Sequence, residues 1–103
     1  MSRFIVSPQA QSDIAEILDF LADEGLAVLE QYEAKFEEAF HLIAQMPLLG
    51  HTRPGFEDLP VRVWVVRPYL VVYLPGSRPV EIVAVLHGAR DVDEVMPDRF
   101  PST

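Results

Sequence analysis

The hydrophobic periodicity of this chain changes once, between Pro47 and Pro60. Before this segment the apolar residues recur every three or four positions, as in amphipathic helices. After it the pattern shifts toward a period of two, as in strands. A length of 103 residues is enough for one hydrophobic core and too short for two. The sequence therefore predicts an α+β fold in which residues 1–103 form a single domain.

The first half of the chain predicts a short strand followed by a helical hairpin. Residues 3–7 form the strand, and Ser7 before Pro8 marks a helix start, because the serine hydroxyl caps free N–H groups and proline fits the first helical position. Gly25 ends this helix, and a second helix spans about 26–46. The apolar stripes are Ala10, Ile14, Ile17, Leu18 and Leu21 in the first helix, and Leu29, Tyr32, Phe36, Phe40 and Ile43 in the second.

The second half predicts three strands, at residues 61–66, 69–74 and 80–86. Their connections are short, so we expect an antiparallel meander with the two helices on one face. A loop at residues 47–60 precedes the strands, and a short helix at 91–96 follows them.

Alternation in the middle strand separates an aliphatic face from an aromatic one. We assign the aliphatic set Leu70, Val72 and Leu74 to the helices, and the set Tyr69, Val71 and Tyr73 to the opposite side. The sequence thus predicts an incompletely covered, polar-aromatic sheet face that bears Arg62, Trp64, Tyr69 and Tyr73.

The composition excludes several kinds of protein. Without cysteine there is no disulfide, thiolate nucleophile or Cys-ligated zinc, and His41, His51 and His87 show no metal-ligand spacing. We expect no metal and no cofactor. No apolar run approaches the roughly 20 residues of a membrane span. The apolar stretch at the N-terminus is too short for a signal peptide, so we expect a cytoplasmic protein without a membrane partner.

The net charge of −8 is unevenly distributed. Residues 1–46 hold nine acids against Arg3 and Lys35, whereas residues 47–103 hold seven acids against six arginines. Affinity for phosphate comes from clustered Lys and Arg, so this balance argues against nucleic-acid binding by the whole surface. Over residues 53–90, five arginines outnumber three acids, which predicts a modest basic strip.

Charged and aromatic residues interrupt the strands and continue into the run at residues 86–91. Strand ends that enter a glycine-containing turn display side chains in a fixed geometry. His87 could act as an acid or base near neutral pH, but a hydrogen-bonding role is more common for such a histidine. The candidate recognition residues are Arg62, Arg67, Tyr69, Tyr73, His87 and Arg90; no catalytic residue is assigned.

Four segments carry a family resemblance. They are Val6-Ser7-Pro8-Gln9-Ala10 followed by Asp13-Ile14, Pro47-Leu48-Leu49-Gly50, Tyr69-Leu70-Val71-Val72-Tyr73, and Val85-Leu86-His87-Gly88-Ala89-Arg90-Asp91. In their order and spacing they resemble the RelE/ParE superfamily of type II toxin–antitoxin toxins, and within it the ParE-like, plasmid-stabilisation branch. The resemblance covers nearly the whole chain. It implies the fold already predicted. Arg90 is the first residue to test, because it matches the His-Gly-x-Arg-Asp type of ending of this family.

The resemblance also implies partners. A cognate antitoxin would wrap the toxin with its C-terminal segment and bind operator DNA with its N-terminal part, so the toxin would meet DNA only indirectly. RelE-like members cut mRNA on the ribosome, and ParE-like members poison DNA gyrase. The six candidate residues would contact the target or the antitoxin.

Three functions remain open. A single lysine, no tyrosine after Tyr73 and the acidic balance favour a ParE-like toxin that acts by binding rather than as an enzyme. The first alternative is a RelE-like, ribosome-dependent mRNA interferase that uses Arg62, Arg67, His87 and Arg90. The second is a degenerate, non-toxic module that only binds its antitoxin. Because the acid load lies in the hairpin, we expect a partner to bring basic residues there, beside an open sheet edge.

Overall fold

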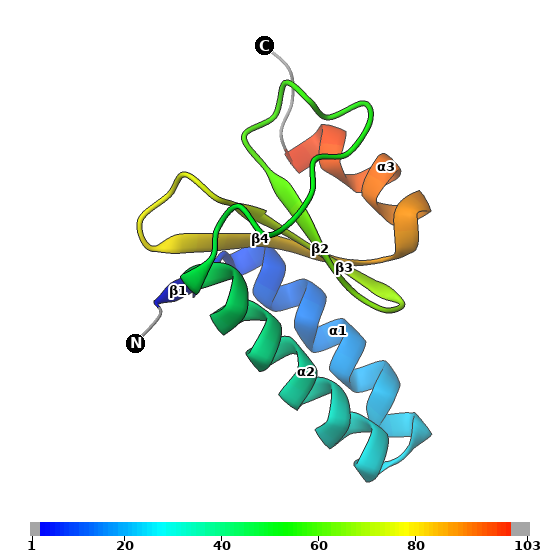
Figure 1. Ribbon diagram of the computed structural model, residues 1–103. Helices are drawn as coiled ribbons and strands as arrows, with labels where there is room; N and C mark the ends of the chain where they lie inside the picture. Colours follow the sequence, from blue (N-terminus) through cyan, green and yellow to red (C-terminus); the bar gives the residue numbers. More distant parts are fainter. Residues whose placement is uncertain (1–2, 100–103) are drawn as a thin grey trace.

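A mixed four-stranded sheet lies between a helical hairpin and a C-terminal helix in the computed structural model (Figure 1). The structure describes residues 3–99, apart from the side chains of Ala89 and Arg90. In chain order the elements are β1 (Phe4–Val6), α1 (Pro8–Glu24), α2 (Leu26–Gln45), β2 (Arg62–Val66), β3 (Tyr69–Leu74), β4 (Val80–His87) and α3 (Gly88–Arg99). The predicted α+β class is confirmed.

The sheet has the strand order β1-β4-β3-β2. β2, β3 and β4 form the predicted antiparallel meander, and β1 adds in parallel to β4, with Val6 opposite Ile82. A bulge interrupts the β3–β4 ladder, because Val72 faces Ala84 whereas Tyr73 faces Ile82. This extra residue changes which side chains of β4 share a face.

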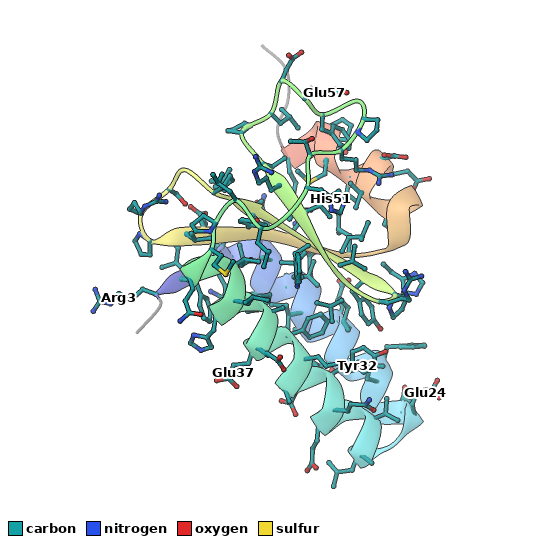
Figure 2. The ribbon with its side chains drawn as sticks, in the orientation of Figure 1. Arg3, Glu24, Tyr32, Glu37, His51 and Glu57 are labelled. Carbon is teal, nitrogen blue, oxygen red and sulfur yellow. The ribbon has the colours of Figure 1, made fainter. Side chains whose placement is uncertain are left out.

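Local signals define the hairpin as expected. The Ser7 hydroxyl accepts a hydrogen bond from the Ala10 N–H at 3.1 Å, and Pro8 is the first residue of α1. Gly25 separates the helices with φ of 131°, a backbone angle that side chains other than glycine rarely adopt. Glu24 at the tip of the hairpin and Glu37 on α2 project into solvent (Figure 2).

The prediction for the two sheet faces is wrong. The face that carries Tyr69, Val71 and Tyr73 packs against the hairpin, where it forms one core with Phe36 and Phe40. Tyr69 is 3% exposed and Tyr73 is fully buried, so no open polar-aromatic face exists there. Large aromatic rings fill the space between a sheet and two helices, and burial of this area outweighs the cost of enclosing two hydroxyl groups.

The aliphatic face is covered by α3 and by the loop before β2, which lie above the sheet in Figure 1. Leu70 and Val72 pack there with Val92 and Met96 of α3 and with the loop residue Phe56. The predicted short helix at 91–96 is in fact longer at both ends and passes through Pro97. No described helix is long and apolar enough to cross a membrane.

Candidate functional site

The strand register divides the candidate residues between two ends of the sheet. Arg62 pairs with Tyr73, whereas Tyr69 pairs with His87. A strand rises about 3.3 Å per residue, so the length of β2 separates the two ends by about 13 Å. One end holds Arg62 and Tyr73, and the other holds Arg67, Tyr69, His87 and the backbone of Arg90. The side chain of Arg90 lies outside the described part of the chain, so its role stays a prediction.

Tyr73 and Arg62 hold the loop that follows α2. The Tyr73 hydroxyl donates to the Pro47 carbonyl at 2.7 Å and accepts from the Gly50 N–H at 2.8 Å. Arg62 donates from Nη1 to the Gly50 carbonyl at 2.7 Å. His51 continues this attachment by exchanging backbone hydrogen bonds with Val63 of β2, and Figure 2 shows it in the loop beside the sheet. Both candidates therefore serve the fold at this end.

The buried phenols are neutral at neutral pH. Burial raises the pKa of Tyr73, although its hydrogen bond from Gly50 and the charge of Arg62 act in the opposite direction. Burial also raises the pKa of Tyr69, and Tyr32 adds to that shift. Tyr73 therefore keeps the proton that it donates to Pro47, and neither hydroxyl can serve as a base near pH 7.

His87 ends β4 as an exposed residue. Its ring packs edge-to-face on Tyr69, with 5.5 Å between the ring centroids. Tyr69 itself is covered by Tyr32 and Phe36 of α2. Of this pair, the imidazole is the group that a partner can reach.

Arg67 is exposed in the turn after β2 and borders an open groove of about 280 Å³ between α2 and β2. We call it the β2 groove; its lining residues are Lys35, Glu38, Ala39, Leu42, Trp64, Val65, Val66 and Arg67. Lys35 also stands over the Tyr32 ring, 4.8 Å from its centroid. Two cations against one acid give this groove a local charge opposite to that of the whole chain.

A second open groove, of about 400 Å³, lies between α1, the end of β4 and the start of α3. We call it the β4 groove; its lining residues are Asp13, Glu16, Ile17, Phe20, Tyr69, Val85, Leu86, His87 and Asp91. Its floor is apolar and its titratable side chains are three carboxylates, a tyrosine and a histidine. The two grooves thus differ in charge, and each includes part of the same end of the sheet.

Sequence reasoning missed an ion pair that joins α1, β4 and α3. Arg99 Nη2 lies 2.7 Å from Asp13 Oδ1, and Nη1 also donates to the Val83 carbonyl at 2.9 Å. Asp13 Oδ2 accepts from the Val85 N–H at 3.0 Å. The hydrogen bond to Asp13 raises the pKa of Arg99, and the opposite charge adds to this while burial opposes it.

A sequence signal for this pair existed. Asp13 is three residues after Ala10 and four before Ile17, which places a carboxylate on the apolar stripe of α1. An acid at such a position is rarely tolerated without a partner.

The described side chains form no metal-binding arrangement. Within residues 3–99, no three His, Asp or Glu side chains are grouped so that they could hold a metal ion. The described geometry offers two open grooves of opposite local charge, one of them lined by the accessible His87.

Comparison with known proteins defines the class. The model of the family described as the ParE toxin of the type II toxin–antitoxin system parDE matches residues 4–92. This chain therefore belongs to the ParE toxin family.

Two curated relatives support this assignment. They are proteins named Toxin ParE1 from Mycobacterium tuberculosis, strain CDC 1551 / Oshkosh and strain ATCC 25618 / H37Rv. Each is 32% identical to the chain over 97 residues, which cover 89% of this chain and 95% of the relative. The family match ends at Val92, within α3, so Arg99 lies beyond the matched residues.

Proposed function

We propose that this chain is the toxin of a type II toxin–antitoxin module, that a cognate antitoxin neutralises it in the cytoplasm, and that it arrests growth by binding DNA gyrase. The observation that carries this proposal is the family match over residues 4–92, because it includes every strand and both helices of the hairpin. In a plasmid host such a module would favour retention of the plasmid.

The geometry supports binding over catalysis. Cleavage of RNA needs several groups that converge on one phosphate to move a proton and stabilise charge. Arg62 donates to the Gly50 carbonyl, and the register places it at the opposite end of the sheet from His87. The groups assigned to an mRNA interferase are therefore divided, whereas Arg67 is free to meet a partner from the rim of the β2 groove.

The decisive experiment is induction of the chain in a bacterial host with and without the neighbouring reading frame. We expect growth arrest, rescue by the neighbouring protein, and loss of supercoiling by purified gyrase when the purified chain is added. Arrest with normal supercoiling and cleaved transcripts would replace gyrase binding with the mRNA-interferase alternative. Normal growth without the neighbour would leave only the non-toxic, antitoxin-binding module.

A matched set of arginine variants tests the recognition end of the sheet. We expect Arg67→Ala and Arg90→Ala to reduce growth arrest at least tenfold, measured as surviving colonies after induction. Arg3→Ala removes the same charge from an exposed residue at the other end of β4, beside β1, and serves as the control. Equal survival for all three variants would place target recognition elsewhere.

A further inference from the structure

The β2 groove lies at the edge of the sheet opposite to β1, because β2 is the other outermost strand. At Val63 this edge is occupied by His51, which exchanges two backbone hydrogen bonds with it, and past the strand the Tyr32 hydroxyl donates to the Arg67 carbonyl at 3.2 Å. Alternate residues of a strand direct their backbone groups to the same edge, so the N–H and carbonyl of Val65 point outward as those of Val63 do. Within residues 3–99 no strand pairs with Val65 on that side, which leaves two backbone groups for an extended segment of another chain.

One face of α2 forms the second wall of this groove. Its lining residues recur at the three- and four-residue spacing that places side chains on one side of a helix; they are Lys35, Glu38, Ala39 and Leu42. Met46 continues the stripe one turn after Leu42, to whose carbonyl its N–H donates at 3.0 Å, and it is 52% exposed. From Lys35 to Met46 the helix rises about 16 Å, which an extended segment of about five residues spans. The wall thus has a charged end and an apolar end.

The charged end of the groove offers two cations that other side chains do not neutralise. Within residues 3–99 neither Lys35 nor Arg67 forms an ion pair, and Lys35 stands over the Tyr32 ring instead. Both cations belong to exposed residues, so an approaching carboxylate can reach them without a change in the fold. Because the chain has a net charge of −8, an acidic segment is repelled by most of its surface and attracted at this groove.

The rest of the lining argues for a protein segment as the occupant rather than a nucleic acid. Leu42 and Val66 offer aliphatic surface, and Trp64 is half-buried and packs on the core under the hairpin, so its ring is not a free platform for a base. Nucleic-acid binding also needs a series of cations along the phosphate backbone. α2 carries four acids and one lysine, which opposes a polyanion but suits a single carboxylate at Lys35.

We propose that the β2 groove is the surface that binds the toxin's target, and that its occupant is an acidic, extended segment of DNA gyrase. One carboxylate of this segment lies between Lys35 and Arg67, and its backbone bonds Val65. An apolar side chain of the same segment covers Leu42 and Met46. This assignment rests on the proposed function, since it takes gyrase as target, and it adds the place and chemistry of the contact. The basic partner segment expected at the acidic hairpin would be repelled here, so target and antitoxin would occupy different faces.

Two charge reversals test the location. Purified gyrase holoenzyme is immobilised and titrated with the purified full-length chain by surface plasmon resonance. Lys35→Glu should weaken binding at least about tenfold, whereas Arg3→Glu, which makes the same charge change outside the groove, should stay within about threefold. Figure 2 shows Arg3 projecting from the left of the view, away from Tyr32, on which Lys35 stands. Equal effects of the two variants would mean that only net charge matters and would overturn the proposal.

The product of the neighbouring reading frame separates failure of this inference from failure of the proposed function. Lys35→Glu should bind that product as tightly as the wild-type chain does, which also shows that the variant is folded. If the wild-type chain does not bind gyrase, the proposed target fails; if it binds and Lys35→Glu binds gyrase equally well, only this inference fails. A variant that loses the neighbouring protein instead of gyrase would assign the groove to the antitoxin and overturn the proposal.

The single lysine of the chain tests the acidity of the occupant directly. A carbodiimide joins a lysine amine to a carboxylate as an amide, and the reagent takes up the water that is lost. In the complex with gyrase, mass spectrometry should identify a peptide that joins Lys35 to an aspartate or glutamate of gyrase. Lys35→Arg should lose this cross-link and still bind, because it keeps the charge. Cross-links formed only by carboxylates of this chain would place gyrase on the acidic hairpin and overturn the proposal.

A second pair of variants tests the apolar end. Met46→Gln should weaken gyrase binding about fivefold through loss of buried apolar surface, whereas Leu26→Gln should stay within about twofold. Leu26 is 68% exposed on the same helix and lies outside the groove. Equal binding by the two variants would remove the apolar contact. In the complex, strand addition predicts slower hydrogen exchange of the Val65 amide, and unchanged exchange there would overturn the extended mode of binding.

Discussion

One buried hydroxyl group fixes the position of the loop between α2 and β2. Tyr73 bonds two backbone groups of that loop, at Pro47 and Gly50, and the absence of a side chain at Gly50 leaves room for the phenol. A Cβ at Gly50 would lie 2.8 Å from the Val63 carbonyl oxygen, which is backbone and cannot rotate away. At the scale of single residues, close approach rather than backbone conformation explains this glycine.

Gly50→Ala should therefore destabilise the protein by about 1–3 kcal/mol, the usual cost of forcing an extra group into a packed site. Gly76→Ala is the matched control, because a Cβ at Gly76 meets nothing within 4 Å. Urea denaturation followed by circular dichroism gives both values. Equal stability of the two variants would contradict the close approach.

The raised pKa values of Tyr69 and Tyr73 predict a loss of stability at high pH. Both phenols hold their protons more tightly in the folded chain than in the unfolded one. The free energy of unfolding is thus unaffected below the unfolded pKa of about 10 and falls as pH rises through that value toward the folded pKa.

Denaturation midpoints between about pH 8 and about pH 11 measure this loss. Tyr73→Phe should lower stability at pH 8 by about 1–3 kcal/mol, because it leaves two backbone groups unpaired, and should flatten the decline above pH 10. An unchanged slope in the variant would mean that Tyr73 does not contribute to the pH dependence.

At the scale of elements, α3 is held to the rest of the fold by two different attachments. Val92 and Met96 pack on the aliphatic face of the sheet, and Arg99 bonds both Asp13 of α1 and the carbonyl of Val83. The ion pair is largely buried, with side-chain exposures of 16% for Arg99 and 12% for Asp13. Asp13 also accepts a hydrogen bond from the Val85 N–H of β4, so this one carboxylate connects α1, β4 and α3.

Asp13→Asn should destabilise the protein by about 3 kcal/mol, because it leaves the Arg99 guanidinium largely buried without a counter-charge. Asp93→Asn is the control. The Arg53–Asp93 pair also reaches α3, at 3.3 Å, but Asp93 is 60% exposed, and exposed pairs contribute about 1 kcal/mol or less. Thermal unfolding measures the stability that each variant loses. An equally small loss for Asp13→Asn would show that α3 depends on packing alone.

At the scale of the whole molecule, charge is separated by region. The hairpin carries most of the acid load, whereas the β2 groove offers Lys35 and Arg67 beside Trp64. Different faces of one small toxin can thus attract partners of opposite charge. Long-range attraction of this kind is screened over a Debye length of about 10 Å at about 0.1 M salt.

Binding of the neighbouring reading frame's product should therefore weaken as salt rises. Between about 0.05 M and about 0.5 M sodium chloride, we expect the dissociation constant to rise at least about fivefold, with most of the change in the association rate. Surface plasmon resonance at the two salt concentrations measures both rates. Affinity that is independent of salt would exclude charge complementarity as a driving force.

Local sequence signals were sufficient to predict the helices and strands and their order along the chain. Ser7, Pro8 and Gly25 define the hairpin through the hydrogen bonds and backbone angles of single residues, and the meander follows from alternation and short connections. The family resemblance also came from short segments, and the match over residues 4–92 confirms it.

The candidate site depended on contacts between residues far apart in the chain. Alternation places the tyrosines of β3 together on one face, but it does not tell which layer covers that face. Which layer covers each face depends on the length of α3 and on the volume of the aromatic rings beneath the hairpin. The bulge at Val83 and the Asp13–Arg99 pair, 86 residues apart, are likewise products of packing. A periodic pattern specifies faces, and only the assembled layers specify which face meets water.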